Sequence, residues 1–228
     1  MHVHLPKPLH GWREFGGEVG IIVIGVLIAL TAEQVVESLH SRHEVSETRK
    51  ALDSELSRDL AAYMFRVNER GCANARLDEL DRWAKSMADG RPLKLKKEVT
   101  QPIFFSINTS VWQATNGDAA AQMPLQPRLQ YAAMYDAMKT YDEVARDETN
   151  GWTTLSDYAA NADLTRAELH DVHHAILDLR FDDQLLDMFG SRFRDFGGKL
   201  NIHPKQHIEG GIASQVEPAV RELCEPLL

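Results

Sequence analysis

The chain has few of the residues and motifs that mark a particular chemistry. Only two of its 228 residues are cysteines, and aromatic residues make up 7%. It contains no Gly-x-Ser-x-Gly elbow, no phosphate-binding loop and no Gly-x-Gly-x-x-Gly pattern. It also lacks an alternating strand pattern, internal repeats and low-complexity tracts. No motif indicates an enzyme class, and we predict a protein that is not an enzyme and uses no cofactor.

Basic residues are also scarce relative to acidic ones. Lys and Arg number 25 against 34 Asp and Glu, which gives a formal net charge of −9. The charges within residues 1–32 cancel, so the whole excess lies in the later part of the chain. An acidic balance argues against nucleic acid as a partner. The composition, 43% hydrophobic and 26% charged, is that of a globular protein.

One long hydrophobic run is present, and its centre, Val19–Ala32, holds no charge. A helix that crosses a bilayer needs about 20 apolar residues, more than this centre supplies. The aromatic and aliphatic flanks extend the run, and the helix from Trp12 to Val36 would be about 37 Å long. We therefore predict a transmembrane helix over residues 11–37, with the lipid bilayer as its partner.

Two other interpretations fit this run less well. A cleavable signal peptide needs a basic start and a small residue three positions before the cut, but Glu14, Glu18 and Leu30 do not fit that pattern. A core helix of a soluble protein would be apolar on one stripe, whereas this run is apolar all round. We favour a single-pass signal anchor.

The charges nearest to the run slightly favour a cytoplasmic amino terminus. Lys7 and Arg13 precede it, and the next basic residues follow at a distance. We therefore predict a cytoplasmic leader over residues 1–10 and an exported domain over residues 38–228.

Small residues in the apolar run indicate where another helix could approach closely. In lipid, helices associate through small residues that let their backbones come near each other. We predict that the partner is another membrane protein or a second copy of the chain, and that it contacts Gly16, Gly17, Gly20 and Gly25.

The region after the run has the periodicity of helices, so we predict an all-α fold in which the membrane helix continues as one long helix to about Arg70. Its apolar face should hold Val45, Leu52, Leu56, Leu60, Met64 and Val67. Its opposite face should be charged and solvated, with Glu44, Glu47, Arg49, Glu55, Arg58 and Asp59. Gly71 is the expected break.

Further helices are predicted over residues 73–87, 110–115, 128–159 and 213–223. Thr165-x-x-Glu168 is a capping box that opens another helix, which Gly197-Gly198 should end. In the helix over 128–159 we expect a core of Leu129, Ala132, Met134, Met138, Tyr141, Val144 and Trp152. Asp142–Glu148 should lie on a solvated face. Residues 91–107 should form a connector whose lysines (Lys94, Lys96 and Lys97) are solvated, with contact to lipid head groups as the alternative.

The two cysteines, Cys72 and Cys224, both fall in the part predicted to be exported. An even number of cysteines in an oxidising compartment indicates a disulfide. Two buried free thiols are the alternative.

The strongest candidate for chemistry is a histidine cluster, Glu168-Leu-His170-Asp171-Val-His173-His174. His170 and His174 are four residues apart and would share a helix face, a spacing that two metal ligands can use. A zinc site needs further ligands, and no second cluster of similar density exists. We predict no metal site, with a metal-binding or enzymatic domain as the alternative.

Two passages resemble a known family. GWREFGGEVGIIVIGVLIALTAEQVVE, followed by CANARLDELDRW, and SVWQATNGDAAAQMP…LQYAAMYDAMKTYDEV are similar to an uncharacterised family of small single-pass inner-membrane proteins of Gram-negative bacteria. The resemblance covers roughly half the chain. It implies an anchor in a bacterial inner membrane and an exported helical bundle, which would place residues 38–228 in the periplasm. It implies no activity. We expect a non-catalytic accessory, scaffolding or sensing subunit that works through helix–helix contacts.

Overall fold

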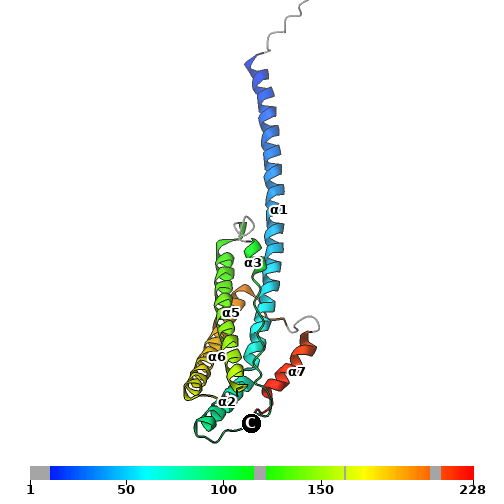
Figure 1. Cartoon of the computed structure of the whole chain (residues 1–228). Coiled ribbons are helices and arrows are strands. Elements are labelled where there is room, and N and C mark those ends of the chain that lie inside the picture. Colours follow the sequence, from blue (N-terminus) through cyan, green and yellow to red (C-terminus); the bar gives the residue numbers. More distant parts are fainter. Residues whose placement is uncertain (1–10, 116–121, 162, 206–211) are drawn as a thin grey trace, which may run out of the picture. The chain divides into compact units, whose positions relative to one another are not determined.

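The chain is all-helical in the computed structural model, which describes residues 11–115, 122–161, 163–205 and 212–228 (Figure 1). No strand occurs in these ranges. The all-α prediction is therefore confirmed, while the predicted leader, 1–10, lies outside the described residues. In chain order the helices are α1 (Trp12–Asn68), α2 (Arg70–Ala88), α3 (Ser110–Thr115), α5 (Leu125–Ala159), α6 (Arg166–Leu200) and α7 (Ile212–Cys224).

Two compact units divide the chain, Met1–Thr48 and Arg49–Leu228. The first consists, where it is described, of the greater part of α1. This helix is long and apolar enough to cross a membrane, and no residue of its most apolar 18-residue window is buried. As the sequence predicted, the helix continues beyond the apolar run without a break, and it ends at Asn68.

The second unit, Arg49–Leu228, contains the last turns of α1 and all the other helices. Helices α5 and α6 run side by side, and α2 packs against both α6 and α7 (Figure 1). Two groups of buried side chains fill the interior. Aromatic rings meet edge to face where α1, α5 and α6 come together, as in the Tyr63–Phe193 pair with ring centroids 4.7 Å apart. A second cluster around Trp83 and Trp152 joins α2, α5 and α6.

The apolar face predicted for the end of α1 is largely correct. Leu52, Leu56 and Leu60 are at most 5% exposed. Met64 is the exception on this face, because 43% of it remains exposed. In α5, Met134, Met138, Tyr141 and Trp152 are buried as expected, but Leu129 is exposed and does not belong to the core.

The helix ends differ from the prediction at two glycines. The break after α1 falls at Glu69, so Gly71 lies inside the first turn of α2. Gly197 and Gly198 do not end α6, which runs to Leu200. Asn201 ends it instead with a left-handed backbone (φ 58°), and the Ile202 N–H donates to the Gly197 carbonyl at 2.8 Å. This is the Schellman type of termination, for which asparagine is suited.

The start of α6 follows the predicted capping box. The Thr165 hydroxyl accepts from the Glu168 N–H at 3.2 Å, and the Glu168 carboxylate accepts from the Thr165 N–H at 2.7 Å. Each side chain thereby satisfies a backbone donor that the first turn of the helix leaves without a partner.

Candidate functional site

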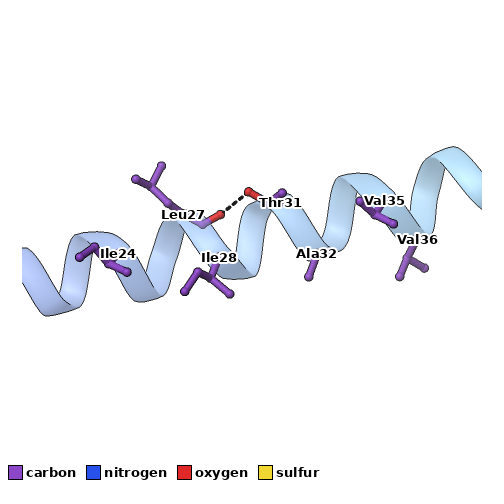
Figure 2. A pocket seen from close by; sticks show the side chains of 7 residues that line it. All are labelled: Ile24, Leu27, Ile28, Thr31, Ala32, Val35 and Val36. Atoms are coloured by element: carbon purple, nitrogen blue, oxygen red, sulfur yellow. Dashed lines mark hydrogen bonds between the residues drawn. The ribbon is translucent and has the colours of Figure 1, made fainter.

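The exposed face of α1 is the most prominent surface of the first unit. Figure 2 shows seven side chains that project from this one helix: Ile24, Leu27, Ile28, Thr31, Ala32, Val35 and Val36. Their spacing of three and four residues places them along one side. The only hydroxyl among them, that of Thr31, donates to the Leu27 carbonyl at 2.6 Å. The Thr31 hydroxyl thus donates its hydrogen bond within the helix, and the surface stays apolar.

The glycines predicted to mediate helix association lie on the same apolar segment. A β-carbon added at Gly16, Gly17, Gly20 or Gly25 would meet no heavy atom of the described chain within 4 Å, apart from the helix's own backbone. Gly16 and Gly20 are four residues apart and so share a face. Space for a second helix therefore exists at these positions, and their role in association stays a prediction.

Within the second unit, buried charges connect four helices. Arg66 of α1 is 1% exposed and donates from Nε to Glu148 of α5 at 2.9 Å, with a second bond from Nη2 to the same carboxylate. Asp183 of α6 accepts from Arg70 of α2 at 3.0 Å and from Asn74 at 3.0 Å. A buried charge is tolerated only when it is paired in this way. Arg66 Nη2 also lies 3.7 Å from Asp183, and the network therefore joins α1, α2, α5 and α6.

A second set of buried carboxylates holds the connector between α2 and α3. Residues 91–109 form no helix, so their backbone N–H groups need other partners. Glu69 accepts from the Ile103 N–H at 3.0 Å, and Asp59 accepts from the Asn108 N–H at 3.0 Å. The acidic side chains thus accept hydrogen bonds that, in a sheet, the carbonyl groups of a neighbouring strand would accept.

Glu55 extends the same arrangement into α3. Its carboxylate accepts from the Val111 N–H at 2.9 Å and from the Tyr135 hydroxyl at 2.7 Å. The Tyr135 ring in turn stacks on Trp112, with centroids 4.9 Å apart. Glu55 is 0% exposed and ties α1, α3 and α5 together.

The charged face predicted for the end of α1 is therefore wrong at two positions, since Glu55 and Asp59 are buried. The prediction of a solvated face over Asp142–Glu148 is likewise wrong at Glu148, which is 4% exposed. Periodicity alone cannot separate a carboxylate that faces water from one that faces backbone amides of a distant segment. The prolines and apolar residues of the connector indicate an extended segment. The backbone N–H groups of such a segment need hydrogen-bond acceptors from elsewhere in the chain.

Burial changes the proton affinity of two of these carboxylates. It raises the pKa of Asp59 to about 7, and the hydrogen bond from the Asn108 N–H only partly opposes this effect. Burial likewise raises the pKa of Glu69 to about 7, against the opposing influence of the Ile103 N–H. Desolvation outweighs hydrogen bonding at both sites.

The histidine cluster lies on an exposed stretch of α6. His170 and His174 stack edge to face with ring centroids 4.4 Å apart, and His173 has its Nδ1 3.9 Å from Asp81. Among the described residues, no three His, Cys, Asp or Glu side chains converge as metal ligands would. His207, which the sequence places four residues after His203, is outside the described ranges.

The connector lysines do not form a merely solvated loop, which corrects the expectation from the sequence. The Lys97 ammonium donates to the Glu222 carbonyl at 2.7 Å and lies 3.1 Å from the Glu225 carboxylate. Lys96 donates to the carbonyl of Leu228. These bonds attach the connector to the last turn of α7 and to the segment that follows it.

Cys72 and Cys224 are joined in the structure as the sequence suggested, with Cα atoms 4.7 Å apart. The bridge links the first turn of α2 to the last residue of α7. Arg76, 1% exposed, donates to the carbonyls of Leu223 and Glu225 at 2.9 Å on either side of Cys224. The cysteine count indicates the bridge, but nothing in the sequence indicates that Arg76 binds the backbone on either side of Cys224.

No protein-family model, curated protein or solved structure matches this chain.

Proposed function

We propose that this chain is a single-pass membrane protein that holds a helical domain in the periplasm, where the domain acts as a non-catalytic accessory, scaffolding or sensing subunit. The observation that carries the proposal is the apolar part of α1, which is exposed on all sides over a length sufficient to cross a bilayer. In water such a surface would be strongly unfavourable, and a bilayer removes that cost.

The nature of the second unit supports a structural role. Its buried charged groups are engaged with one another or with backbone amides and carbonyls, as Arg66, Glu55 and Arg76 illustrate. These contacts hold helices and connectors in place. Contact with a partner would then come from helix surfaces, including the apolar face shown in Figure 2.

A reporter experiment tests the anchor and its orientation. Alkaline phosphatase, active only after export, and green fluorescent protein, fluorescent in the cytoplasm, are fused separately after Leu228. We expect phosphatase activity without fluorescence, and we expect the fusion to stay in the membrane fraction after alkaline carbonate extraction. Fluorescence alone would reject the exported domain, and extraction by carbonate would reject the anchor.

The non-catalytic role has its own test. Metal analysis of the full chain purified in detergent should find no stoichiometric zinc or iron. A stoichiometric metal that is lost in the His170→Ala variant would instead favour a metal-binding domain built on the histidine cluster.

A further inference from the structure

The second half of the connector, residues 100–108, is attached to the helices through carboxylates. In the part of the chain that the structure describes, no backbone–backbone hydrogen bond involves these residues. Three of their N–H groups donate to acidic side chains instead: Ile103 to Glu69 at 3.0 Å, Ile107 to Asp142 at 3.2 Å and Asn108 to Asp59 at 3.0 Å. The polar attachment of this segment therefore depends on the state of a few acidic groups.

Two of these three carboxylates are buried. Asp59 is 4% exposed and Glu69 is 3% exposed, whereas Asp142 is partly exposed and pairs with Arg146 at 2.8 Å. The Asp59 Oδ2 and Glu69 Oε1 atoms are buried and have no hydrogen-bond partner in the described chain. A carboxyl group in such surroundings is more costly as an ion than as a neutral acid. Ionisation of Asp59 and Glu69 therefore opposes the closed position of the segment.

The groups that face Asp59 do not remove this cost. Glu55 on α1 and Asp142 on α5 are acidic and disfavour a further negative charge. The Tyr135 hydroxyl donates to Glu55. Arg58 is the basic group that faces Asp59, and it is exposed, so water screens its charge. Burial prevails and raises the pKa of Asp59 to about 7.

The surroundings of Glu69 lead to the same result. Arg66 on α1 favours its ionised form, but this guanidinium already donates to Glu148 of α5 at 2.9 Å. The Glu148 carboxylate disfavours a second negative charge nearby. Burial therefore also raises the pKa of Glu69 to about 7, although the Ile103 N–H opposes the shift.

The apolar contacts of the segment are limited. Pro102 is buried, whereas Phe104 and Phe105 are only partly buried. The Phe105 ring meets Phe65 of α1 edge to face with centroids 5.4 Å apart, and the Arg146 guanidinium lies 5.8 Å from the Phe104 ring centroid. Since no hydrogen bond within a helix involves residues 100–108, the segment can separate from α1 and α5 while the helices stay folded.

We propose that residues 100–108 form a proton-controlled strap, which lies against α1 and α5 while Asp59 and Glu69 are neutral and detaches locally when both ionise. The two protons pass to water, and water then reaches both carboxylates. Detachment also uncovers apolar side chains beneath the strap, Phe65 among them. A rise in pH is thereby converted into a newly exposed apolar surface on the second unit.

The first test follows the strap by hydrogen exchange of the full chain in detergent at pH 5.5 and pH 8. Peptide mass spectrometry gives the rates, which are divided by the intrinsic rate at each pH. Linkage between a pKa of about 7 in the closed strap and 3.8 or 4.5 in water predicts that protection of residues 102–109 falls by up to about thirtyfold for each group. Residues 134–141 of α5 should stay about tenfold or more better protected than the strap at both pH values.

Two results of this experiment would overturn the proposal. Equal protection of the strap and of residues 134–141 would mean that the strap opens only when the whole unit unfolds. Strap protection that does not change between pH 5.5 and pH 8 would mean that ionisation of the two carboxylates does not open it.

The second test removes the ionisable groups and keeps an acceptor oxygen at each position. Asp59→Asn and Glu69→Gln should each abolish one group's share of the pH dependence, and the double variant should abolish nearly all of it. Asp157→Asn, an exposed change on α5, should behave as the wild type. A folded double variant whose strap keeps the full pH dependence would overturn the proposal. If the double variant does not fold by circular dichroism, the wild-type comparison decides.

Discussion

At the scale of single residues, two buried carboxylates hold the connector by accepting hydrogen bonds from its backbone N–H groups. Asp59 and Glu69 each accept from one N–H group of the connector, at 3.0 Å. Each also keeps one buried oxygen, Asp59 Oδ2 and Glu69 Oε1, without a hydrogen-bond partner in the described chain. A half-satisfied buried carboxylate holds its proton more tightly than one in water. The consequence is a dependence of stability on pH.

The sign of this dependence follows from the direction of the two shifts. The pKa values of Asp59 and Glu69 rise to about 7 in the folded protein, from 3.8 and 4.5. Between those limits the folded chain binds more protons than the unfolded chain, so stability from these groups is present in full at low pH and is lost as pH rises toward 7. We expect the free energy of unfolding to be lower at pH 8 than at pH 5.5.

The variant Asp59→Asn isolates the contribution of one group, because its side chain resembles the neutral acid. Denaturant unfolding of the full chain in detergent at pH 5.5 and pH 8 should show a smaller difference for this variant than for the wild type. Asp157→Asn, an exposed change on α5, serves as the control. An unchanged difference in Asp59→Asn would assign the pH dependence to other groups.

At the scale of secondary structure, an apolar face packs the last turns of α1 inside the second unit. Leu56 is 0% exposed, whereas Met64 on the same face is 43% exposed. The variant Leu56→Asp would bury an unpaired charge, at a cost of several kcal/mol. We expect its melting temperature, followed by circular dichroism, to fall well below that of Met64→Asp. Equal melting of the two variants would mean that Leu56 is not buried.

The periodicity of the sequence predicts the helices well and their partners poorly. Spacings of three and four residues identify an apolar face, and the Thr165 capping box identifies a helix start, because both depend on residues close in sequence. The burial of Glu55 depends on an amide 56 residues away, and that of Glu148 on Arg66, 82 residues away. Such pairings are set by tertiary packing, which a single sequence does not display.

Helix ends are hard to predict for a related reason. Gly197 and Gly198 are weak helix formers, but their cost is of the order of 1 kcal/mol each, and packing of α6 exceeds it. Gly197 lies where a β-carbon would come within 3.0 Å of the Ile202 carbonyl, so glycine suits the turn that follows. The left-handed residue is Asn201, and Gly197 makes room for the chain to reverse.

At the scale of the whole molecule, the bridge between Cys72 and Cys224 spans 152 positions. Closing a loop of this length lowers the entropy of the unfolded chain by an amount equivalent to about 4–5 kcal/mol in the chain-entropy model. The double variant Cys72→Ser/Cys224→Ser should therefore unfold at lower denaturant concentration than the oxidised wild type.

Reduced wild-type protein provides the control, since it should unfold together with the double variant. A loss much below about 1 kcal/mol, against the 4–5 of the chain-entropy model, would show that the bridge strains the folded chain or that the reduced unfolded chain keeps residual structure.

The bridge has another consequence, for proteolysis. A single cut at any peptide bond between Cys72 and Cys224 leaves both products in one covalent particle, because the second fragment remains attached to α2 through Cys224. On a denaturing gel, such a nicked chain would run as one band without reductant and as two bands with it. Shedding of the second unit from the apolar helix then needs a cut before Cys72, or a cut inside the loop together with reduction.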